Sequence, residues 1–206
     1  NWYRAVSAYE AVKLNVIPNF THIAPINEKP ERKINIIFAR RLEIYRGTRI
    51  FANVISRVLA EQDNVFVTVA GSGPDEKYIK DKLSSFGERV IFLKYVSDQS
   101  LLIHADKHIA VIPTIGSEGT SLSLLEAMSA QCAVICSNVG GMTNVVIDGY
   151  NGLMISPREE ELYEAIIRLV KDGNLRKRLA LNAYQTVRAG FSYEKWRESW
   201  KRLLQK

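Results

Sequence analysis

Short, β-branched apolar runs alternate with longer segments of helical spacing along most of the chain. Five such runs lie at residues 34–39, 65–70, 90–93, 108–112 and 133–137. Each is apolar on both faces, as strands are when helices cover both sides of a parallel sheet. The segments with helical spacing lie near residues 47–61, 75–86, 97–105 and 121–131. This alternation predicts an α/β fold, a doubly wound parallel sheet with helices on both faces.

The C-terminal part of the chain has a different pattern. A short apolar run at 153–156 predicts a sixth and last strand, and from Pro157 onward the spacing is helical, with breaks at Gly173 and Gly190. The helix predicted at 192–206 carries an apolar stripe on one face, formed by Tyr193, Trp196, Trp200 and Leu203 or Leu204. Such a stripe is more typical of packing on protein than of a helix that lies on a membrane.

Composition sets the class of protein. With 206 residues, 47% of them hydrophobic, the chain can bury a substantial core. No apolar run approaches the roughly 18 residues that cross a bilayer, and residues 1–14 lack the charged-then-apolar pattern of a secretory signal. We therefore expect a cytoplasmic protein. Cys132 and Cys136 flank one predicted strand, and we expect free buried thiols rather than a disulfide or a metal site.

The net charge of +6 favours an anionic partner. Charge alone does not distinguish a phosphorylated small molecule, an anionic membrane surface and nucleic acid. Nucleic acid is disfavoured because basic and aromatic residues are not interleaved as they are where bases stack. His104 and His108 are four positions apart, but no Glu follows His104, which disfavours a zinc pair. No metal site is predicted.

The loop after the run at 108–112 is the first candidate site. In an open parallel sheet, ligands bind beyond the carboxyl ends of the strands, where helix N-termini present unpaired N–H groups. The loop reads "TIGSEGTS" (114–121), and hydroxyl residues suited to capping begin the next helix around 120–123. Gly119 would let a phosphate approach the backbone closely. The pattern predicts an anion site at this helix start.

Two carboxylates, Glu118 and Glu126, flank this turn. One interpretation is a capping box from Ser123 to Glu126, in which Glu126 only accepts from a backbone N–H. It leaves Glu118 unexplained, because a carboxylate beside a phosphate repels it unless it faces another part of the ligand. Two acids on either side of a phosphate-binding turn favour hydroxyl recognition. A nucleotide diphosphate sugar has hydroxyl-bearing groups on both sides of its phosphates.

Positive charge follows the run at 34–39, where Arg40, Arg41 and Arg46 precede Gly47. Arginine suits forked contact with phosphate, although these residues could also be solvated loop charges. A third loop, "GSGPDEKY" (71–78), lacks the third glycine of a dinucleotide-binding fingerprint. We expect it to form a tight strand-to-helix turn near the ligand.

The order of these motifs over residues 15 to about 200 resembles a known domain. It is similar to the C-terminal, nucleotide-sugar-binding domain of retaining glycosyltransferases of the GT-B architecture, which has two Rossmann-like domains, and specifically to glycosyltransferase family 4 (group 1). The matching stretches are "VIPN" (16–19), "RLEIYRG" (41–47), "VTVAGSGP" (67–74), "VIFLKYVS" (90–97), "SEGTSLSLLEAMSA" (117–130), "VGGMTNVVIDGYNGLMI" (139–155) and "FSYEKW" (191–196).

The resemblance implies roles for individual residues. Arg41 and Arg46 would hold the donor diphosphate, and Glu118 would face the donor sugar. The other donor-binding positions implied are Gly71, Tyr95, Val96, Ser97, Gly119, Thr120, Ser121 and Glu126. Glu126 would bind the ribose, and residues 95–97 would border the base. The donor would be a nucleotide diphosphate sugar, UDP- or GDP-linked, with no prosthetic group and no metal.

The sequence departs from the family pattern in four places. In one of them, "AQCAV" (130–134) replaces the usual glycine and proline after the helix. Arg46 replaces the usual lysine, Arg40 stands where glycine is common, and Thr120 stands where an aromatic residue is common. These departures leave the donor's identity open.

The resemblance also implies a domain organisation. Residues 15–190 would be the Rossmann-like donor domain, and 191–206 the helix that crosses back to an N-terminal acceptor-binding domain. Residues 1–14 would be the end of the connection from that domain, which the chain does not contain. Alone, the chain would bind nucleotide and transfer nothing. A lipid-linked acceptor would bring peripheral contact with the inner face of the membrane.

Other functions are compatible with parts of the pattern. A sugar-nucleotide epimerase of GT-B architecture would bind the same kind of donor. A non-catalytic nucleotide-sugar-binding module is a second alternative, but Arg41, Glu118 and Glu126 are all present. A nicotinamide-dependent dehydrogenase ranks last because of the missing third glycine.

Overall fold

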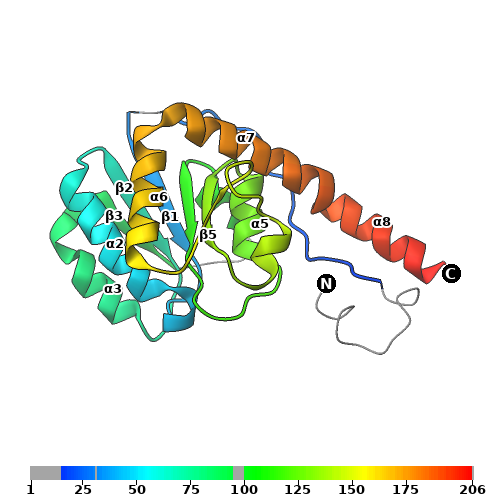
Figure 1. Ribbon diagram of the computed structural model, residues 1–206, viewed down its shortest axis with the longest axis horizontal. Coiled ribbons are helices and arrows are strands. Elements are labelled where there is room, and N and C mark those ends of the chain that lie inside the picture. The colour runs from blue at the N-terminus through cyan, green and yellow to red at the C-terminus, as the bar shows by residue number, and fades with distance from the viewer. Residues whose placement is uncertain (1–14, 31, 95–99, 206) are drawn as a thin grey trace.

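Figure 1 presents a computed structural model of the chain, which describes residues 15–30, 32–94 and 100–205. The helix predicted at 1–13 and the site residues Tyr95, Val96 and Ser97 lie outside the described residues.

The centre of the molecule is a parallel sheet of six strands in the order β3-β2-β1-β4-β5-β6. The strands are β1 (Ile34–Ala39), β2 (Val65–Ala70), β3 (Val90–Leu93), β4 (Ile109–Ile112), β5 (Ala133–Ser137) and β6 (Leu153–Ile155). All six predicted strands are confirmed to within one residue. The strand order reverses between β1 and β4, and a parallel sheet has its ligand crevice at the carboxyl ends of such a switch point.

Helices cover both faces of the sheet, which confirms the predicted doubly wound architecture. The α-helices are α2 (Thr48–Glu61), α3 (Glu76–Leu83), α4 (Ser100–His104), α5 (Leu122–Ser129), α6 (Glu159–Lys171), α7 (Gly173–Gly190) and α8 (Tyr193–Leu204). The described part of the chain also forms the 3₁₀ turns η2 (Ile44–Arg46), η3 (Ser84–Arg89) and η5 (Gly140–Asn144). Gly173 and Gly190 are the first and last residues of α7, at the predicted breaks.

Alternate residues of the strands build two separate cores. In β1, Ile36 and Phe38 face the core that α2, α3 and α6 cover, whereas Ile37 faces the core under α5. Both sets are fully buried, since none of the three side chains is more than 1% exposed. This double burial explains why the strands show no polar alternation in the sequence. Helix α7 contributes to both cores, so it passes over the end of the sheet from one face to the other.

Helix α8 extends from α7 beyond the sheet (Figure 1). The predicted apolar stripe packs on a segment of the same chain, because the ring of Trp196 lies 4.6 Å from that of Phe20 and Tyr193 lies 5.2 Å from it. Backbone hydrogen bonds join the two segments, from the N–H of Thr21 to Phe191 and from the N–H of Tyr193 back to Thr21. Packing on protein is thus observed for part of the stripe, while Trp200 is 39% exposed.

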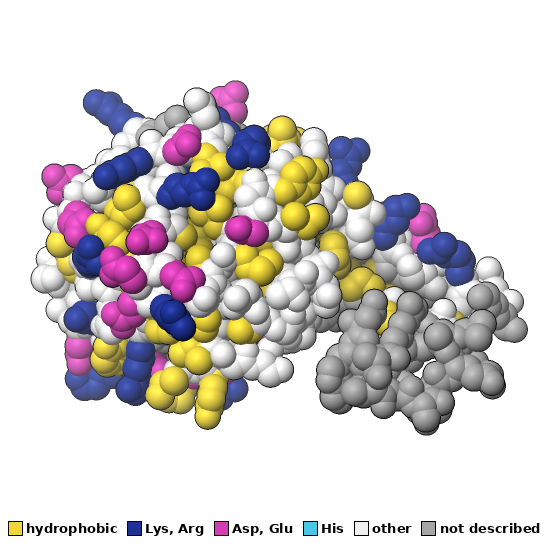
Figure 2. Space-filling model, viewed as in Figure 1, with side chains coloured by type: hydrophobic (Ala, Val, Ile, Leu, Met, Phe, Trp, Pro, Cys, Tyr) yellow, Lys and Arg dark blue, Asp and Glu magenta, His cyan; other side chains and the backbone are white. Residues whose placement is uncertain are grey.

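The charged residues of the face in Figure 2 are mixed in sign over α2, α3 and α6. Arg57 of α2 lies 3.2 Å from Glu61 and 3.1 Å from Glu160 of α6, and Lys80 of α3 lies 2.7 Å from Glu76. The net positive charge is therefore not gathered on this face. Exposed pairs of this kind contribute little to stability.

Two further expectations concern the cysteines and the membrane. Cys132 and Cys136 are free and buried, as predicted. Burial raises the pKa of the Cys136 thiol to about 12, so this thiol stays protonated and inert.

Among the helices of the described residues, none combines the length and the apolar character that crossing a bilayer requires.

Replacing Phe51 with Ala is expected to destabilise the fold by about 3–5 kcal/mol, since a buried aromatic ring is lost. Phe51 is fully buried in α2 and stacks on Phe38 of β1 with 4.7 Å between ring centroids. Chemical denaturation monitored by circular dichroism measures the loss. Leu181→Ala, at a half-exposed position of α7, serves as the control and should change the free energy of unfolding by less than about 0.5 kcal/mol. Equal losses for both variants would contradict the assigned core.

Replacing Trp196 with Ala is expected to loosen α8 from the segment that contains Phe20. An aromatic pair contributes about 0.5–1.5 kcal/mol beyond its buried area, so exchange of the Thr21 and Tyr193 amide hydrogens should accelerate about threefold to tenfold. Hydrogen exchange measured by NMR tests this, with Leu204→Ala at the exposed end of α8 as the control. If Trp196→Ala left both amides as protected as in the wild type, the contact would not hold the helix.

Candidate functional site

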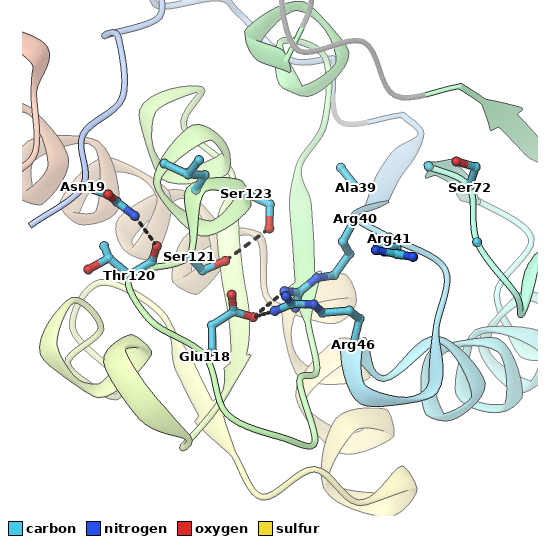
Figure 3. Close-up of a pocket in the computed structure, with 13 residues that line it drawn as sticks. Asn19, Ala39, Arg40, Arg41, Arg46, Ser72, Glu118, Thr120, Ser121 and Ser123 are labelled. Carbon is cyan, nitrogen blue, oxygen red and sulfur yellow. Dashed lines mark hydrogen bonds and ion pairs between the residues drawn. The ribbon is translucent and has the colours of Figure 1, made fainter.

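A cavity of about 690 Å³ opens at the carboxyl edge of the sheet, beside the switch point (Figure 3). Three regions far apart in sequence line it. The first comprises residues 39–41 at the end of β1 and Arg46 of η2, the second is residues 71–73 after β2, and the third runs from Glu118 to Ser123 into α5. Asn19 closes one side, where its side-chain amide donates to the backbone oxygen of Thr120 at 3.1 Å.

Glu118 is the centre of the polar contacts in this cavity. Its Oε2 atom accepts from Nη2 of Arg40 at 2.7 Å, from Nη1 of Arg46 at 2.5 Å and from the hydroxyl of Thr114 at 3.0 Å. Arg40 also donates from Nη1 to the same hydroxyl at 2.6 Å. Figure 3 shows the two guanidinium groups converging on one carboxylate oxygen, with the other oxygen turned toward α5.

The charges determine the state of Glu118. Burial alone would raise its pKa, but the charges and hydrogen bonds of Arg40 and Arg46 outweigh burial and hold the pKa below the ordinary value of 4.5. Burial also lowers the pKa of Arg40, and the pairing with Glu118 opposes that shift. Since arginine stays protonated in proteins, the three groups together carry a net charge of +1 at neutral pH. The cavity is therefore suited to an anion.

The N-terminus of α5 adds a second source of positive potential. Its N-cap residue is Ser121, whose side chain makes no capping hydrogen bond, and Ser121, Leu122 and Ser123 all line the cavity. The first backbone N–H groups of a helix lack intrahelical partners and carry part of the helix dipole, so they attract phosphate.

The capping-box interpretation is wrong. It requires Ser123 as the N-cap, whereas α5 already begins at Leu122 and the N–H of Leu125 donates to the oxygen of Ser121 at 3.1 Å. Ser123 and Glu126 are thus inside the helix. Glu126 is partly exposed one turn along α5 and is not among the residues that line the cavity.

Two glycines fix the backbone around Glu118 and Arg40. Gly140, at φ +54°, lies against the 118–120 loop so closely that an added Cβ would be 2.1 Å from the oxygen of Glu118. Gly71, at φ +151°, lies against the loop after β1, and a Cβ there would be 2.0 Å from the oxygen of Arg40. Both positions combine a backbone conformation and a close approach that only glycine tolerates. They hold the two loops that carry the central ion pair.

The structure brings most of the predicted site residues together. The cavity lining includes Gly71, Arg41, Arg46, Glu118, Thr120 and Ser121, and Gly119 lies between two of these in the same loop. Arg41 differs from the other arginines: its side chain is 70% exposed, lies 3.4 Å from Glu43, and points away from Glu118 (Figure 3). The predicted contact of Arg41 with phosphate stays a prediction.

Sequence reasoning missed several lining residues. Arg40 was grouped with Arg41 and Arg46 as a candidate phosphate contact or loop charge and was not singled out, yet it is the buried arginine of the site, with a side chain 5% exposed. Asn19 ends the matched stretch 16–19, which was a signal available in the sequence. Thr114 does not line the cavity but bonds to Arg40 and Glu118, and it had no signal beyond its place after a strand.

The histidines are placed as expected. His104 ends α4 and His108 precedes β4, so they flank a helix-to-strand junction. Nδ1 of His108 accepts from the backbone N–H of Asn35 at 3.1 Å. Within the described ranges, no group of three or more His, Cys, Asp or Glu side chains is arranged to hold a metal ion.

Solved structures resemble this fold. The HepE protein of Anabaena, crystallised in complex with UDP, superposes with a TM-score of 0.74 at 20% identity, over 84% of this chain and 49% of that one. The C-terminal domain of LpcC, a glycosyl transferase group 1 family protein of Francisella tularensis, superposes with a TM-score of 0.69 at 25% identity, over 80% of this chain and 89% of that one.

Sequence comparison extends further along the chain. An uncharacterized glycosyltransferase of Methanocaldococcus jannaschii is 26% identical over 202 residues, which cover 96% of this chain and 52% of that protein. The chain thus spans about half the length of the curated relatives that it matches. The profile of the family described as "Glycosyl transferases group 1" matches residues 19–186, which include every described residue that lines the cavity. The chain belongs to the glycosyl transferases group 1 family.

Proposed function

We propose that this chain is the donor-binding part of a retaining glycosyltransferase that transfers a sugar from a nucleotide diphosphate sugar to an acceptor hydroxyl. The observation that carries the proposal is the cavity at the switch point, where Arg46, Glu118 and the start of α5 converge. Cationic groups and a helix N-terminus suit the diphosphate, and a carboxylate beside them suits sugar hydroxyls.

Each part of the donor has a candidate partner. Arg46 is 34% exposed and would bind the diphosphate together with Arg41 and the backbone of 119–121. Glu118 would accept hydrogen bonds from the donor sugar, and Glu126 would bind the ribose. Uridine is the favoured base, because HepE has been crystallised with UDP and with UDP-glucose. GDP has no comparable support.

The chemistry of transfer needs stabilisation of the leaving diphosphate. Positive side chains and the dipole of α5 would supply it as negative charge develops on the phosphate oxygen. We propose that no metal ion takes part, and that the leaving phosphate accepts the acceptor's proton while the sugar keeps its anomeric configuration. The acceptor would bind to an N-terminal domain across the cleft, and a lipid-linked acceptor would hold the protein at the inner face of the membrane.

Calorimetric titration of the chain with UDP, GDP, ADP and UDP-glucose is the test. Arg46→Ala should weaken UDP binding about tenfold to 100-fold, because a charged hydrogen bond contributes about 1.5–3 kcal/mol. Glu126→Ala should weaken UDP and UDP-glucose equally, whereas Glu118→Gln should weaken UDP-glucose more than UDP.

Arg49→Ala is the matched control for this titration, since Arg49 pairs with Asp75 at 2.9 Å and is not among the cavity-lining residues. Its affinities should equal those of the wild type. Failure of the wild-type chain to bind any of the nucleotides would overturn the donor-binding function for this chain.

In a longer protein that carries both domains, we expect transfer from UDP-glucose to give an α-linked product, because the α-linked donor keeps its configuration. NMR of the product's anomeric proton measures this outcome. Excess EDTA should leave the rate within about twofold, since side chains rather than a metal stabilise the diphosphate. A β-linked product would overturn retention, loss of activity in EDTA would overturn metal independence, and epimerised donor without acceptor would favour the epimerase.

A further inference from the structure

Two arginines share one oxygen of Glu118, but they are held very differently. The side chain of Arg40 is 5% exposed, whereas that of Arg46 is 34% exposed. Arg40 has a second anchor in the hydroxyl of Thr114, 2.6 Å from Nη1. Among the residues that the structure describes, the side chain of Arg46 has one further ion pair besides its bond to Glu118, a longer contact of 3.5 Å with Glu43. The side chain of Arg40 is thus held in one conformation, whereas that of Arg46 has room to change its conformation.

The backbone adds to the fixation of Arg40. Its N–H donates to the oxygen of Ala70 at 2.9 Å, and Gly71 lies against its carbonyl group. The Nε atom of Arg40 is buried and has no hydrogen-bond partner within the described part of the chain. Leaving a buried N–H group without a hydrogen-bond partner costs about 1–3 kcal/mol. The other contacts of the Arg40 side chain therefore hold it in this position.

A donor diphosphate changes the balance of charge around Glu118. The proposed function has Arg46 bind the diphosphate, and a turn of its guanidinium toward a phosphate would weaken its bond to Glu118. Without a second cation, Glu118 would become an unpaired carboxylate beside two phosphate charges. The described charged groups that face Glu118 are Arg40, from the end of β1, and Arg46, from η2, with Glu43 next to Arg46.

We propose that Arg40 is a positioning residue that keeps Glu118 ionised and oriented when Arg46 leaves it for the donor diphosphate. This inference rests on the proposed function. Arg46 exchanges one anionic partner for another, while Arg40 and Thr114 hold Oε2 in place. The second carboxylate oxygen, Oε1, is then presented to the donor sugar. The residue at position 40 therefore determines whether donor binding is independent of pH.

The first measurement needs no ligand. The pKa of Glu118, followed through its side-chain carboxyl carbon by NMR, should rise in both Arg40→Met and Arg46→Met, and further in Arg40→Met. The pairing with the two arginines lowers the pKa of Glu118 in the folded protein. Its contribution to the free energy of unfolding is therefore present above a pH of about 4.5 and is lost as the pH falls through the lower folded pKa. If the pKa of Glu118 rose no further in Arg40→Met than in Arg46→Met, the dominant role of Arg40 would be overturned.

The second measurement is the dissociation constant of UDP-glucose at pH 5.5 and pH 7.5. Both phosphates of this probe are esterified, so it lacks the terminal phosphate that titrates near pH 6. The wild-type value should agree at the two pH values within about twofold. Arg40→Met should bind about tenfold more weakly at pH 7.5 than at pH 5.5, because the bound phosphates would then raise the pKa of Glu118, and a rise of one unit on binding corresponds to a factor of ten.

Three variants separate positioning from a structural defect. Arg40→Lys should restore the flat pH profile, since it restores the charge, and the double variant Arg40→Met with Glu118→Gln should also be flat. Arg49→Met, outside the cavity, should behave as the wild type. Should Arg40→Met fail to fold, Arg40→Gln carries the same expectation.

The outcomes distinguish the two proposals. If wild-type chain binds UDP-glucose but Arg40→Met is weakened equally at both pH values, Arg40 is structural and the inference is overturned. If the wild-type chain does not bind UDP-glucose, the proposal that it uses this donor is overturned. The pKa of Glu118 in Arg40→Met and in Arg46→Met, measured without ligand, still decides whether Arg40 is the dominant partner of Glu118.

Discussion

The ion pair between Arg40 and Glu118 is the contact on which the site depends. It joins the end of β1 to the loop that leads into α5, and Thr114 completes a closed triangle of hydrogen bonds. Removing one partner of a buried pair typically costs about 3–5 kcal/mol, because the other charge stays buried and unpaired. The pair is therefore a constraint on position more than a source of net stability, and the surrounding backbone is shaped to preserve it.

Sheet topology explains why this contact is possible. The strand order places β1 beside β4, so the loops that follow these two strands diverge at one edge and leave a crevice between them. Arg40 comes from one loop and Glu118 from the other, and they meet across that crevice at 2.7 Å. Gly71 and Gly140 support the two loops from behind, from neighbouring strands on either side. A chain with the same residues but without the order reversal would not bring these side chains together.

The sequence predicted the fold more completely than the site, for physical reasons. Burial on both faces imposes an apolar pattern on every strand, which a single sequence displays. By contrast, whether Arg40 or Arg41 pairs with Glu118 depends on the orientation of the backbone at the end of β1, which no periodicity encodes. The start of α5 lies within the predicted range, but the capping-box interpretation chose the wrong serine for a similar reason. Ser121 and Ser123 are equally good caps by chemistry, and backbone hydrogen bonds selected Ser121.

A strap of residues 19–24 links the site to the C-terminal helix. Asn19 donates to the backbone just before α5, while Ser129 at the end of α5 bonds to the backbone of His22 and Ala24 at 2.7 and 2.8 Å. The same strap is paired with α8 through Thr21. Helix α5 is thus fixed at both ends by a segment that also holds α8. Because the start of α5 lines the cavity, a displacement of α8 would shift the first N–H groups of α5 relative to Arg40. The position of the C-terminal helix and the geometry of the cavity are therefore not independent.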